Sequence, residues 1–397
     1  HLVSMPKYSE LPLFSMEIVA SLYSPWITGT AMYILWFIAT FNVKSQAEDF
    51  GPMWLARCLR AAFKLIMRIL GVTWEARFTI PKEDLFALLG GRGAIGAVSP
   101  HGCYSTASVF LGVPSFRCDP ELRKLHVNFA AASVLFWVPV LREYLLLFGG
   151  REANRSTVKR LLAAGHIVAV CPGGVWEQVH TDRFEEKVFV QRNKGFLRLA
   201  LEASVPVMPM YGFGENQLYS TSLAHLSWRQ HIAKKYRVGL PWIVPSRRLA
   251  WGFGRVGLGL GPVPCTLPHP THVVHVLGAP VFSAAAPSSA TASTPSETVN
   301  AATASAASAA SAAARKRKTN ASVATPTRRE GEVDEKAVKR LFGSYKASLF
   351  ELFNKHKTEL LPPDVASKGL RVIWLGDEDK KSKIPQETKV GTKAKAI

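Results

Sequence analysis

The stretch GAIGAVSPHG, residues 93–102, decides how the fold is interpreted. Its first six residues form a short apolar run, which is typical of a strand buried on both faces. The run ends at Ser99-Pro100-His101-Gly102, where proline fixes the backbone and glycine permits a tight turn. A histidine at the end of a strand is often only a hydrogen-bonded structural residue, but it can also act as a general base. The rest of the chain has to decide between these two interpretations.

Other apolar runs predict a sheet around this strand. They are HIVAVC (166–171), VPVMPMY (205–211) and HVVHVLG (272–278). Helical stretches, among them STVKRLLAAG and NKGFLRLALEA, lie between the runs. This alternation predicts an α/β fold with a mostly parallel sheet flanked by helices. Pro206 and Pro209 weaken the prediction for the second of these runs or place it at an edge of the sheet.

The composition limits the environment and the partners. The chain has 397 residues, 48% of them hydrophobic, and a formal charge of +20. Such a charge suits nucleic acid or an anionic membrane. The five cysteines show no paired spacing, which predicts neither a zinc finger nor a disulfide framework and favours a reducing, cytosol-facing environment. Since residue 1 is His, we expect the true start of the protein to be missing.

The N-terminal region predicts contact with a membrane. After a segment over 1–17, residues 18–43 contain no charged side chain, and this length suffices for a membrane-embedded helical segment. Pro25 and Gly29 make a hairpin as reasonable as a straight span, and a buried core helix is the alternative. Residues 44–75 then predict an amphipathic interfacial helix with one basic stripe, although a helix packed on the globular domain fits equally well. The stripe consists of Arg57, Arg60, Lys64 and Arg68.

The remaining chain divides by composition. Residues 76–282 form the predicted α/β domain, and 283–327 are an Ala/Ser/Thr-rich insertion that we expect to be disordered. Residues 328–365 return to a helical pattern that completes the domain, and 366–397 form a polar tail.

Two strand ends carry the candidate chemistry. Ser99-Pro100-His101-Gly102 follows one buried run, and CPGGVWEQ (171–178) follows another. Parallel strands would place both at the same edge of the sheet, where ligands bind in open α/β folds. His101 could deprotonate a hydroxyl, and Gly173 and Gly174 could stabilise an oxyanion or cradle a phosphate. Glu177 could orient His101 or belong to a structural pair.

Several other functions lack their motifs. The sequence contains no Gly-x-Ser-x-Gly elbow, no Walker loop and no Gly-x-Gly-x-x-Gly opening a helix after a strand. His269, His272 and His275 have no acidic or cysteine neighbours, so no metal site is predicted. No nucleic-acid-binding motif is visible, and basic charge beside a membrane segment has a simpler explanation in lipid.

Several long blocks resemble one family. They are VPVLREYLLLFGG (138–150), CPGGVWEQ (171–178), RNKGFLRLALEASVPVMPMYGFGENQLY (192–219) and LFELFNKHKTEL (349–360). With these blocks the chain resembles the type-2 diacylglycerol acyltransferases and their monoacylglycerol and wax-ester relatives, within the glycerolipid acyltransferase superfamily. The similarity runs from about Arg92 to Pro362, without the insertion.

The resemblance assigns roles to individual residues. The family signature His-Pro-His-Gly is Ser99-Pro100-His101-Gly102 here, so the base His101 is kept. The position of the superfamily's acidic partner is Thr106, which leaves Glu143 and Glu177 as candidates for that role. The implied substrate-binding positions are Pro100, Gly102, Gly173, Gly174, Arg192, Lys194, Phe213, Gly214, Glu215 and Asn216.

The resemblance also implies a reaction. We expect acyl-CoA-dependent formation of triacylglycerol from diacylglycerol at the cytosolic face of the endoplasmic reticulum membrane, or on lipid droplets. Monoacylglycerol, a fatty alcohol or a lysophospholipid are alternative acceptors, and a catalytically silent lipid-binding protein is the alternative from another class. Acyl-CoA is the co-substrate, with no metal or redox cofactor. The expected partners are a neutral lipid acceptor and a phospholipid membrane but no nucleic acid, and a homo-oligomer is compatible with the sequence.

Overall fold

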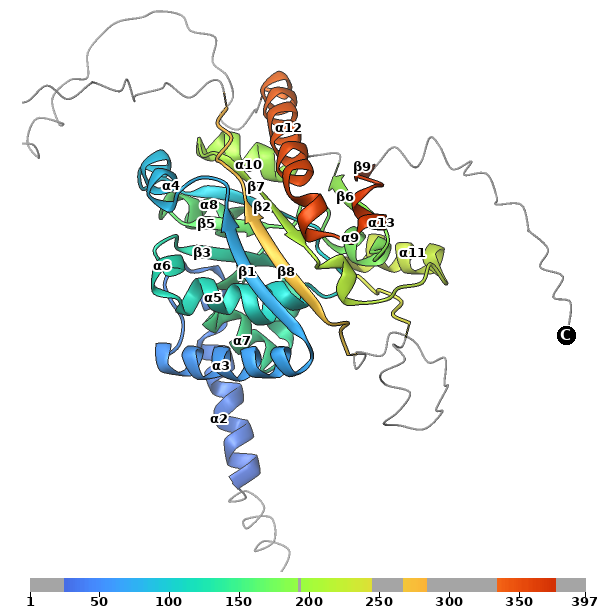
Figure 1. Ribbon diagram of the computed structural model, residues 1–397. Helices are drawn as coiled ribbons and strands as arrows, with labels where there is room; N and C mark the ends of the chain where they lie inside the picture. Colours follow the sequence, from blue (N-terminus) through green and yellow to red (C-terminus); the bar gives the residue numbers. More distant parts are fainter. Residues whose placement is uncertain (1–24, 192–193, 245–266, 284–333, 376–397) are drawn as a thin grey trace, which may run out of the picture.

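The computed structural model describes residues 25–191, 194–244, 267–283 and 334–375, and this part of the chain contains a seven-stranded sheet in the order β1-β8-β7-β2-β5-β3-β4 (Figure 1). The strands from β7 to β4 are mutually parallel, whereas β8 pairs antiparallel with β7 and parallel with β1. The predicted α/β fold with a mostly parallel sheet is confirmed. The strands are β1 (Val72–Phe78), β2 (Ala94–Ser99), β3 (Val127–Ala131), β4 (Gly150–Glu152), β5 (Ile167–Val170), β7 (Val207–Phe213) and β8 (Thr271–Leu277).

Helices cover both faces of this sheet. Side chains alternate between the two faces along a strand. Ile95 and Ala97 of β2 accordingly pack in one cluster with α8, α10 and α12, whereas Ala94 packs in another with α4. On this second side α3 contacts β1, and the short helix α5 (Val113–Cys118) contacts β3. The longer helices are α2 (Pro25–Ala39), α3 (Met53–Ile69), α4 (Lys82–Leu89), α8 (Arg155–Ala163), α10 (Gly195–Ala203), α11 (Leu226–Tyr236) and α12 (Glu335–Leu360).

Short helices and a two-stranded sheet complete the described fold. The sheet pairs β6 (Glu186–Gln191) in parallel with β9 (Leu370–Leu375), so part of the range predicted as a polar tail is a strand. The short α-helices are α5 (Val113–Cys118), α6 (Pro120–Arg123), α7 (Leu141–Leu147), α9 (Val175–His180) and α13 (Pro363–Ala366). The 3-10 and π segments are η1 (Phe41–Ser45), η2 (Ser108–Gly112), η3 (Ser133–Trp137) and η4 (Asn216–Leu218).

One prediction for the sheet was wrong. Strand β7 contains Pro209, and it lies between β8 and β2 rather than at an edge. The ladder to β8 is interrupted at this residue, since the pairing passes from Val207 with Val281 to Met210 with Leu277. The Pro209 carbonyl still accepts a hydrogen bond from the Gly278 N–H (2.8 Å). The absence of a backbone N–H at Pro209 is therefore tolerated, because this residue lies where the ladder to β8 is interrupted.

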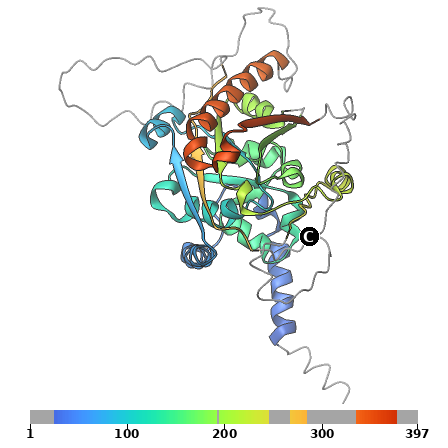
Figure 2. The same cartoon turned by 45° about the vertical axis from the view of Figure 1, so that its right-hand side comes forward.

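The described part of the N-terminal segment is helical. Within the predicted membrane-embedded segment, helix α2 is 15 residues long, and residues 18–24 lie outside the described residues. None of the helices described by the structure has the length and apolar character needed to cross a membrane. Helix α2 projects from the body of the protein (Figures 1 and 2).

The predicted amphipathic helix of residues 44–75 is present as α3. It packs on the domain through Ala56 and Met67, and its basic residues Arg57, Lys64 and Arg68 are exposed. Residues 1–17 and nearly all of the predicted disordered insertion, 284–327, lie outside the described residues.

Candidate active site

The two strand ends meet as the sequence predicts. Strands β2 and β5 are parallel neighbours, with Ala97 opposite Val170, so the turns that follow them share one edge of the sheet. Gly102 has a φ of +65°, and a Cβ at this position would lie 2.9 Å from Cγ of Glu215. Only glycine fits this turn without strain or displacement of its neighbour. The close approach places Glu215, from the end of β7, directly beside the His101 turn.

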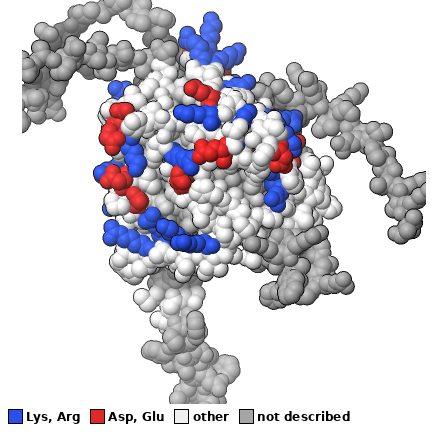
Figure 3. All heavy atoms as spheres, viewed as in Figure 1, with Lys and Arg blue, Asp and Glu red and all other residues white. Residues whose placement is uncertain are grey.

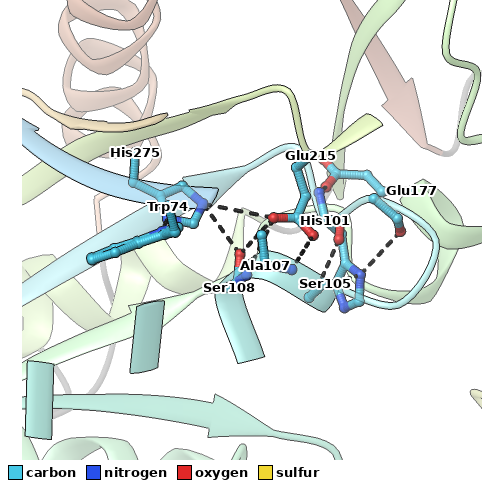
Figure 4. A network of polar contacts seen from close by, with 9 residues as sticks. Trp74, His101, Ser105, Ala107, Ser108, Glu177, Glu215 and His275 are labelled. Carbon is cyan, nitrogen blue, oxygen red and sulfur yellow. Dashed lines mark hydrogen bonds and ion pairs between the residues drawn. The ribbon is translucent and has the colours of Figure 1, made fainter. Parts of the chain in front are cut away.

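His101 is the central titratable group of this edge (Figure 4). Its Nδ1 lies 3.0 Å from the Ser105 Oγ and 3.3 Å from the Gly102 carbonyl oxygen. The Ser105 hydroxyl also donates to the carbonyl oxygen of His101 (2.7 Å). Burial lowers the pKa of His101, because desolvation penalises the charged imidazolium. The imidazole is therefore neutral at physiological pH, as a general base must be.

Glu177 holds the backbone of His101 rather than its imidazole. Its Oε2 accepts a hydrogen bond from the His101 N–H (2.7 Å), and its Oε1 accepts one from the Phe189 N–H (3.1 Å). Burial raises the pKa of Glu177 to about 8, although both backbone hydrogen bonds oppose this shift. The carboxyl group thus links the β2 turn to strand β6. It positions His101 through the main chain.

Glu215 ends a second polar network beside the same turn. Its Oε1 accepts from the Ala107 N–H (3.2 Å), and its Oε2 accepts from both the N–H and the hydroxyl of Ser108 (3.3 and 3.1 Å). His275 Nε2 lies 3.1 Å from the Ser108 Oγ, and its Nδ1 accepts from the Trp74 Nε1–H (2.6 Å). Burial raises the pKa of Glu215 to about 7 and lowers that of His275 to about 4.

The direction of these hydrogen bonds follows from chemistry. An indole N–H only donates, so Nδ1 of His275 carries no proton, and its neutral ring must be protonated at Nε2. That N–H points to Ser108, whose hydroxyl in turn donates to Glu215. The chain of donors from Trp74 therefore ends at the carboxyl group of Glu215, which faces the segment that follows His101.

Glu143 is not brought to His101. Its Oε2 accepts from the Tyr33 hydroxyl (2.7 Å) and the Val140 N–H (2.8 Å), and its Oε1 accepts from Arg142 (2.7 Å). Within the described part of the chain, every hydrogen bond given to Glu143 goes to α2 or to the start of α7. The carboxylate thus fixes helix α2 against α7 instead of orienting His101. The sequence did not predict this contact between the two helices.

The glycine turn after β5 uses one of its two predicted donors internally. The Gly174 N–H donates to the Cys171 carbonyl oxygen (3.1 Å) and closes the turn. A Cβ on Gly173 would lie 2.6 Å from Cγ of Glu177, so glycine is needed here for the close approach. Of the pair, only the Gly173 N–H lacks an acceptor among the residues described, and it remains the candidate oxyanion donor.

The other predicted substrate-binding residues lie at different depths. Phe213 is fully buried and stacks on Phe353 (5.7 Å between ring centroids), so it belongs to the core. Asn216 donates to Glu186 (2.9 Å) inside a buried network. Gly214 has a φ of +91° directly before Glu215. Lys194 precedes α10 with its Nζ 5.6 Å from the Phe342 ring centroid, and Arg192 lies outside the described residues.

Sequence reasoning missed Ser105, Ser108 and the role of His275. No group of three or more His, Cys, Asp or Glu side chains that could hold a metal ion occurs among the described residues. His272 and His275 lie on opposite faces of β8, because their separation of three residues is odd, and only His275 is buried. This strand alternation is the signal that could have separated His275 from its neighbours.

Comparison with known proteins gives a consistent result. The family described as diacylglycerol acyltransferase matches residues 78–291. Human 2-acylglycerol O-acyltransferase 3 is 24% identical over 68% of this chain and 76% of its own length. Rat diacylglycerol O-acyltransferase 2 is 33% identical over 49% of this chain and 55% of its own length. Human acyl-CoA wax alcohol acyltransferase 2 is 30% identical over 37% of this chain and 43% of its own length. The chain thus spans about half, or less, of the last two relatives, and no solved structure matches it.

Proposed function

Because the chain belongs to the diacylglycerol acyltransferase family and is therefore an acyltransferase, we propose that it transfers an acyl group from acyl-CoA to diacylglycerol and forms triacylglycerol. The observation that carries the proposal is the position of His101. Its neutral imidazole stands at the carboxyl edge of the sheet, in a turn held by Glu177 and packed against Glu215. This is the edge where open α/β folds bind their ligands.

The reaction needs one base and one site for negative charge. His101 takes the proton from the acceptor hydroxyl, and the oxygen attacks the thioester carbonyl carbon of acyl-CoA. The carbonyl oxygen becomes negative, and the N–H of Gly173, in the turn after the neighbouring strand β5, is proposed to stabilise it. The C–S bond then breaks, the new ester leaves, and the imidazolium returns the proton to the CoA thiolate. Arg192 and Lys194 are proposed to bind the CoA phosphates.

The exposed side chains of α3, η3 and α2 support the proposal that the acceptor reaches the protein from a membrane. Figure 3 shows basic side chains in a row over α3, above an uncharged border. Trp54 and Ile69 of α3 are 66% and 75% exposed, and Trp137 at the end of η3 is 60% exposed. Large exposed apolar side chains beside cations are typical of an interfacial helix. Further exposed apolar residues are Leu65 and Ile66 of α3, Val134, Val138 and Val140 in and after η3, and Ile27, Met32, Ile34, Leu35 and Ile38 of α2.

Helix α3 also contacts the segment that follows His101. The rings of Phe63 on α3 and Phe110 on η2 are 5.1 Å apart between centroids, and η2 begins at Ser108, which donates to Glu215. A lipid bound at α3 would therefore lie close to the candidate site. We propose that α2 and α3 hold the protein on the cytosolic face of the endoplasmic reticulum membrane or on a lipid droplet.

The acceptor is the open part of this proposal. Relatives named for 2-acylglycerol and for wax alcohol make a monoacylglycerol or a fatty alcohol the alternatives within the same mechanism. A catalytically silent lipid-binding protein is the alternative outside it. The intact His101 turn supports the enzyme.

Labelled oleoyl-CoA separates these possibilities. Membranes from cells without neutral-lipid synthesis, with and without the expressed full chain, receive diacylglycerol, monoacylglycerol, hexadecanol or lysophosphatidylcholine in separate reactions. We expect label in triacylglycerol, with diacylglycerol preferred over the other acceptors. Label chiefly in another ester would replace the acceptor, and no label in any lipid above the empty membranes would overturn the proposed function.

A further inference from the structure

Among the described residues, both hydrogen-bond partners of His101 Nδ1 act as acceptors toward it. The Gly102 carbonyl oxygen, 3.3 Å away, has no hydrogen to donate. The Ser105 hydroxyl has one hydrogen, which it donates to the carbonyl oxygen of His101 (Oγ to O, 2.7 Å). Toward the ring, 3.0 Å away, the Ser105 oxygen therefore offers a lone pair.

We propose that Ser105 is the positioning residue that keeps the proton of the neutral His101 ring on Nδ1 and thereby leaves Nε2 free as the base. This inference rests on the proposed function, since it concerns the same base. Ser105 occupies a left-handed backbone conformation with a φ of +50°, which turns its side chain back onto the residue four positions earlier. Figure 4 shows Ser105 beside the His101 ring.

Ser105 takes the role that an acidic residue has in the superfamily pattern. The residue at the position of the superfamily's acid is Thr106, whose hydroxyl is hydrogen-bonded to the Tyr219 hydroxyl (3.0 Å) rather than to the ring of His101. Without a carboxylate at Nδ1, an uncharged hydroxyl has to fix the ring and its tautomer. The titratable groups around the turn are Glu177 of α9, Glu215 after β7, Cys171 after β5, and Cys103 and Tyr104 of the turn itself. They are unchanged when Ser105 is replaced.

Removal of the hydroxyl has two consequences. The Gly102 carbonyl alone stabilises the Nδ1–H tautomer of His101 less. Part of the protein then carries the ring proton on Nε2, and Nε2 can no longer act as the base. We expect kcat to fall about five- to tenfold, which is the value of one neutral hydrogen bond. The hydroxyl also accepts from the charged imidazolium, so its loss lowers the pKa of His101. Both the pH at which activity is half lost on the acid side and the titration midpoint of His101 should move to lower pH.

Two variants and one chemical probe test this. Ser105→Ala and Ser105→Gly both remove the hydroxyl, but only glycine relieves the positive φ, so a common effect reports the hydroxyl. Ser156→Ala, an exposed serine at the start of α8, is the matched control. The full-length proteins in membranes are treated with diethylpyrocarbonate, which modifies unprotonated imidazole. Modification of His101 is followed by peptide mass spectrometry from pH 5 to pH 8, beside the rate of acyl transfer.

The outcomes are distinct. The inference predicts a lower midpoint of His101 modification in both Ser105 variants, with the control unchanged. An unchanged midpoint in both overturns it, even if the rate falls, because a structural effect alone lowers the rate. An acyl group found on Ser105 after incubation with acyl-CoA would also overturn it and make the serine a nucleophile. If the wild type forms no ester, the proposed function fails, and the modification midpoints still decide the role of Ser105.

Discussion

Replacement of Glu215 should reveal how the polar network supports the His101 turn. In Glu215→Ala, the two backbone N–H groups of Ala107 and Ser108 lose their acceptor. The Ser108 hydroxyl keeps the hydrogen bond that its oxygen accepts from His275 but loses the acceptor of its own hydrogen, so the sum over the two backbone groups alone is a lower bound. Each buried donor without a partner costs about 1–3 kcal/mol, so the free energy of unfolding should fall by about 2–6 kcal/mol.

Glu215→Gln separates the shape of this side chain from its charge. The amide keeps one acceptor oxygen but places an NH₂ group where the other oxygen accepted, so the variant should lose about 1–3 kcal/mol at pH 5. Burial raises the pKa of Glu215 from 4.5 to about 7. Between these values the folded protein holds a proton that the unfolded chain has released, so the wild type loses stability as pH rises, by about 3 kcal/mol in total. Glutamine does not titrate, and at pH 8 the variant should be about as stable as the wild type.

Pulse proteolysis in urea measures these differences on the detergent-solubilised chain at pH 5 and pH 8. Other titrating groups are common to both proteins, so the comparison isolates Glu215. A Glu215→Ala variant as stable as the wild type would refute the hydrogen-bond argument. A difference between wild type and Glu215→Gln that stays constant from pH 5 to pH 8 would refute the raised pKa.

Three further predictions concern the turn, the membrane surface and the insertion. Gly102→Ala should destabilise the protein by about 1–3 kcal/mol more than Gly91→Ala in thermal or urea unfolding, because both have a positive φ but only Gly102 lies against another side chain. Equal effects would contradict the close packing on Glu215. Reversal of Lys64 and Arg68 to Glu should weaken sedimentation with phosphatidylserine vesicles by about 1 kcal/mol for each cation removed, and unchanged binding would show that α3 does not face the lipid. Deletion of residues 283–327 should leave the rate of acyl transfer within about twofold, since their composition predicts no packed core; loss of activity in a folded protein would disprove this.

The sequence predicted the edge of the sheet more reliably than the partners at that edge. His101 and the Gly173-Gly174 turn could be placed together because each follows an apolar run and the runs alternate with helices. This inference needs only strand direction, which the connection pattern fixes. The prediction that Pro209 places its strand at an edge of the sheet was wrong. The gap in the ladder to β8 depends on a neighbouring strand that is distant in the sequence.

The hydrogen-bond partners of His101 could not be predicted in the same way. Glu177 and Glu143 both stood at matching positions, but Glu177 binds the backbone of His101 and Glu143 binds Tyr33 of α2. Such choices depend on side-chain geometry across elements up to 110 residues apart. Ser105 and His101 are only four residues apart, yet their contact depends on a positive φ at a serine, which residue type alone does not indicate.

The most direct test of the account is the initial rate of triacylglycerol formation by wild type and His101→Ala at equal amounts of folded protein. Membranes carrying each protein receive labelled oleoyl-CoA and diacylglycerol, and proteolysis in urea checks that both are folded. Loss of a general base should lower the rate by about 10²–10⁴-fold. An unchanged rate in the folded variant would contradict the assignment of His101 as the base.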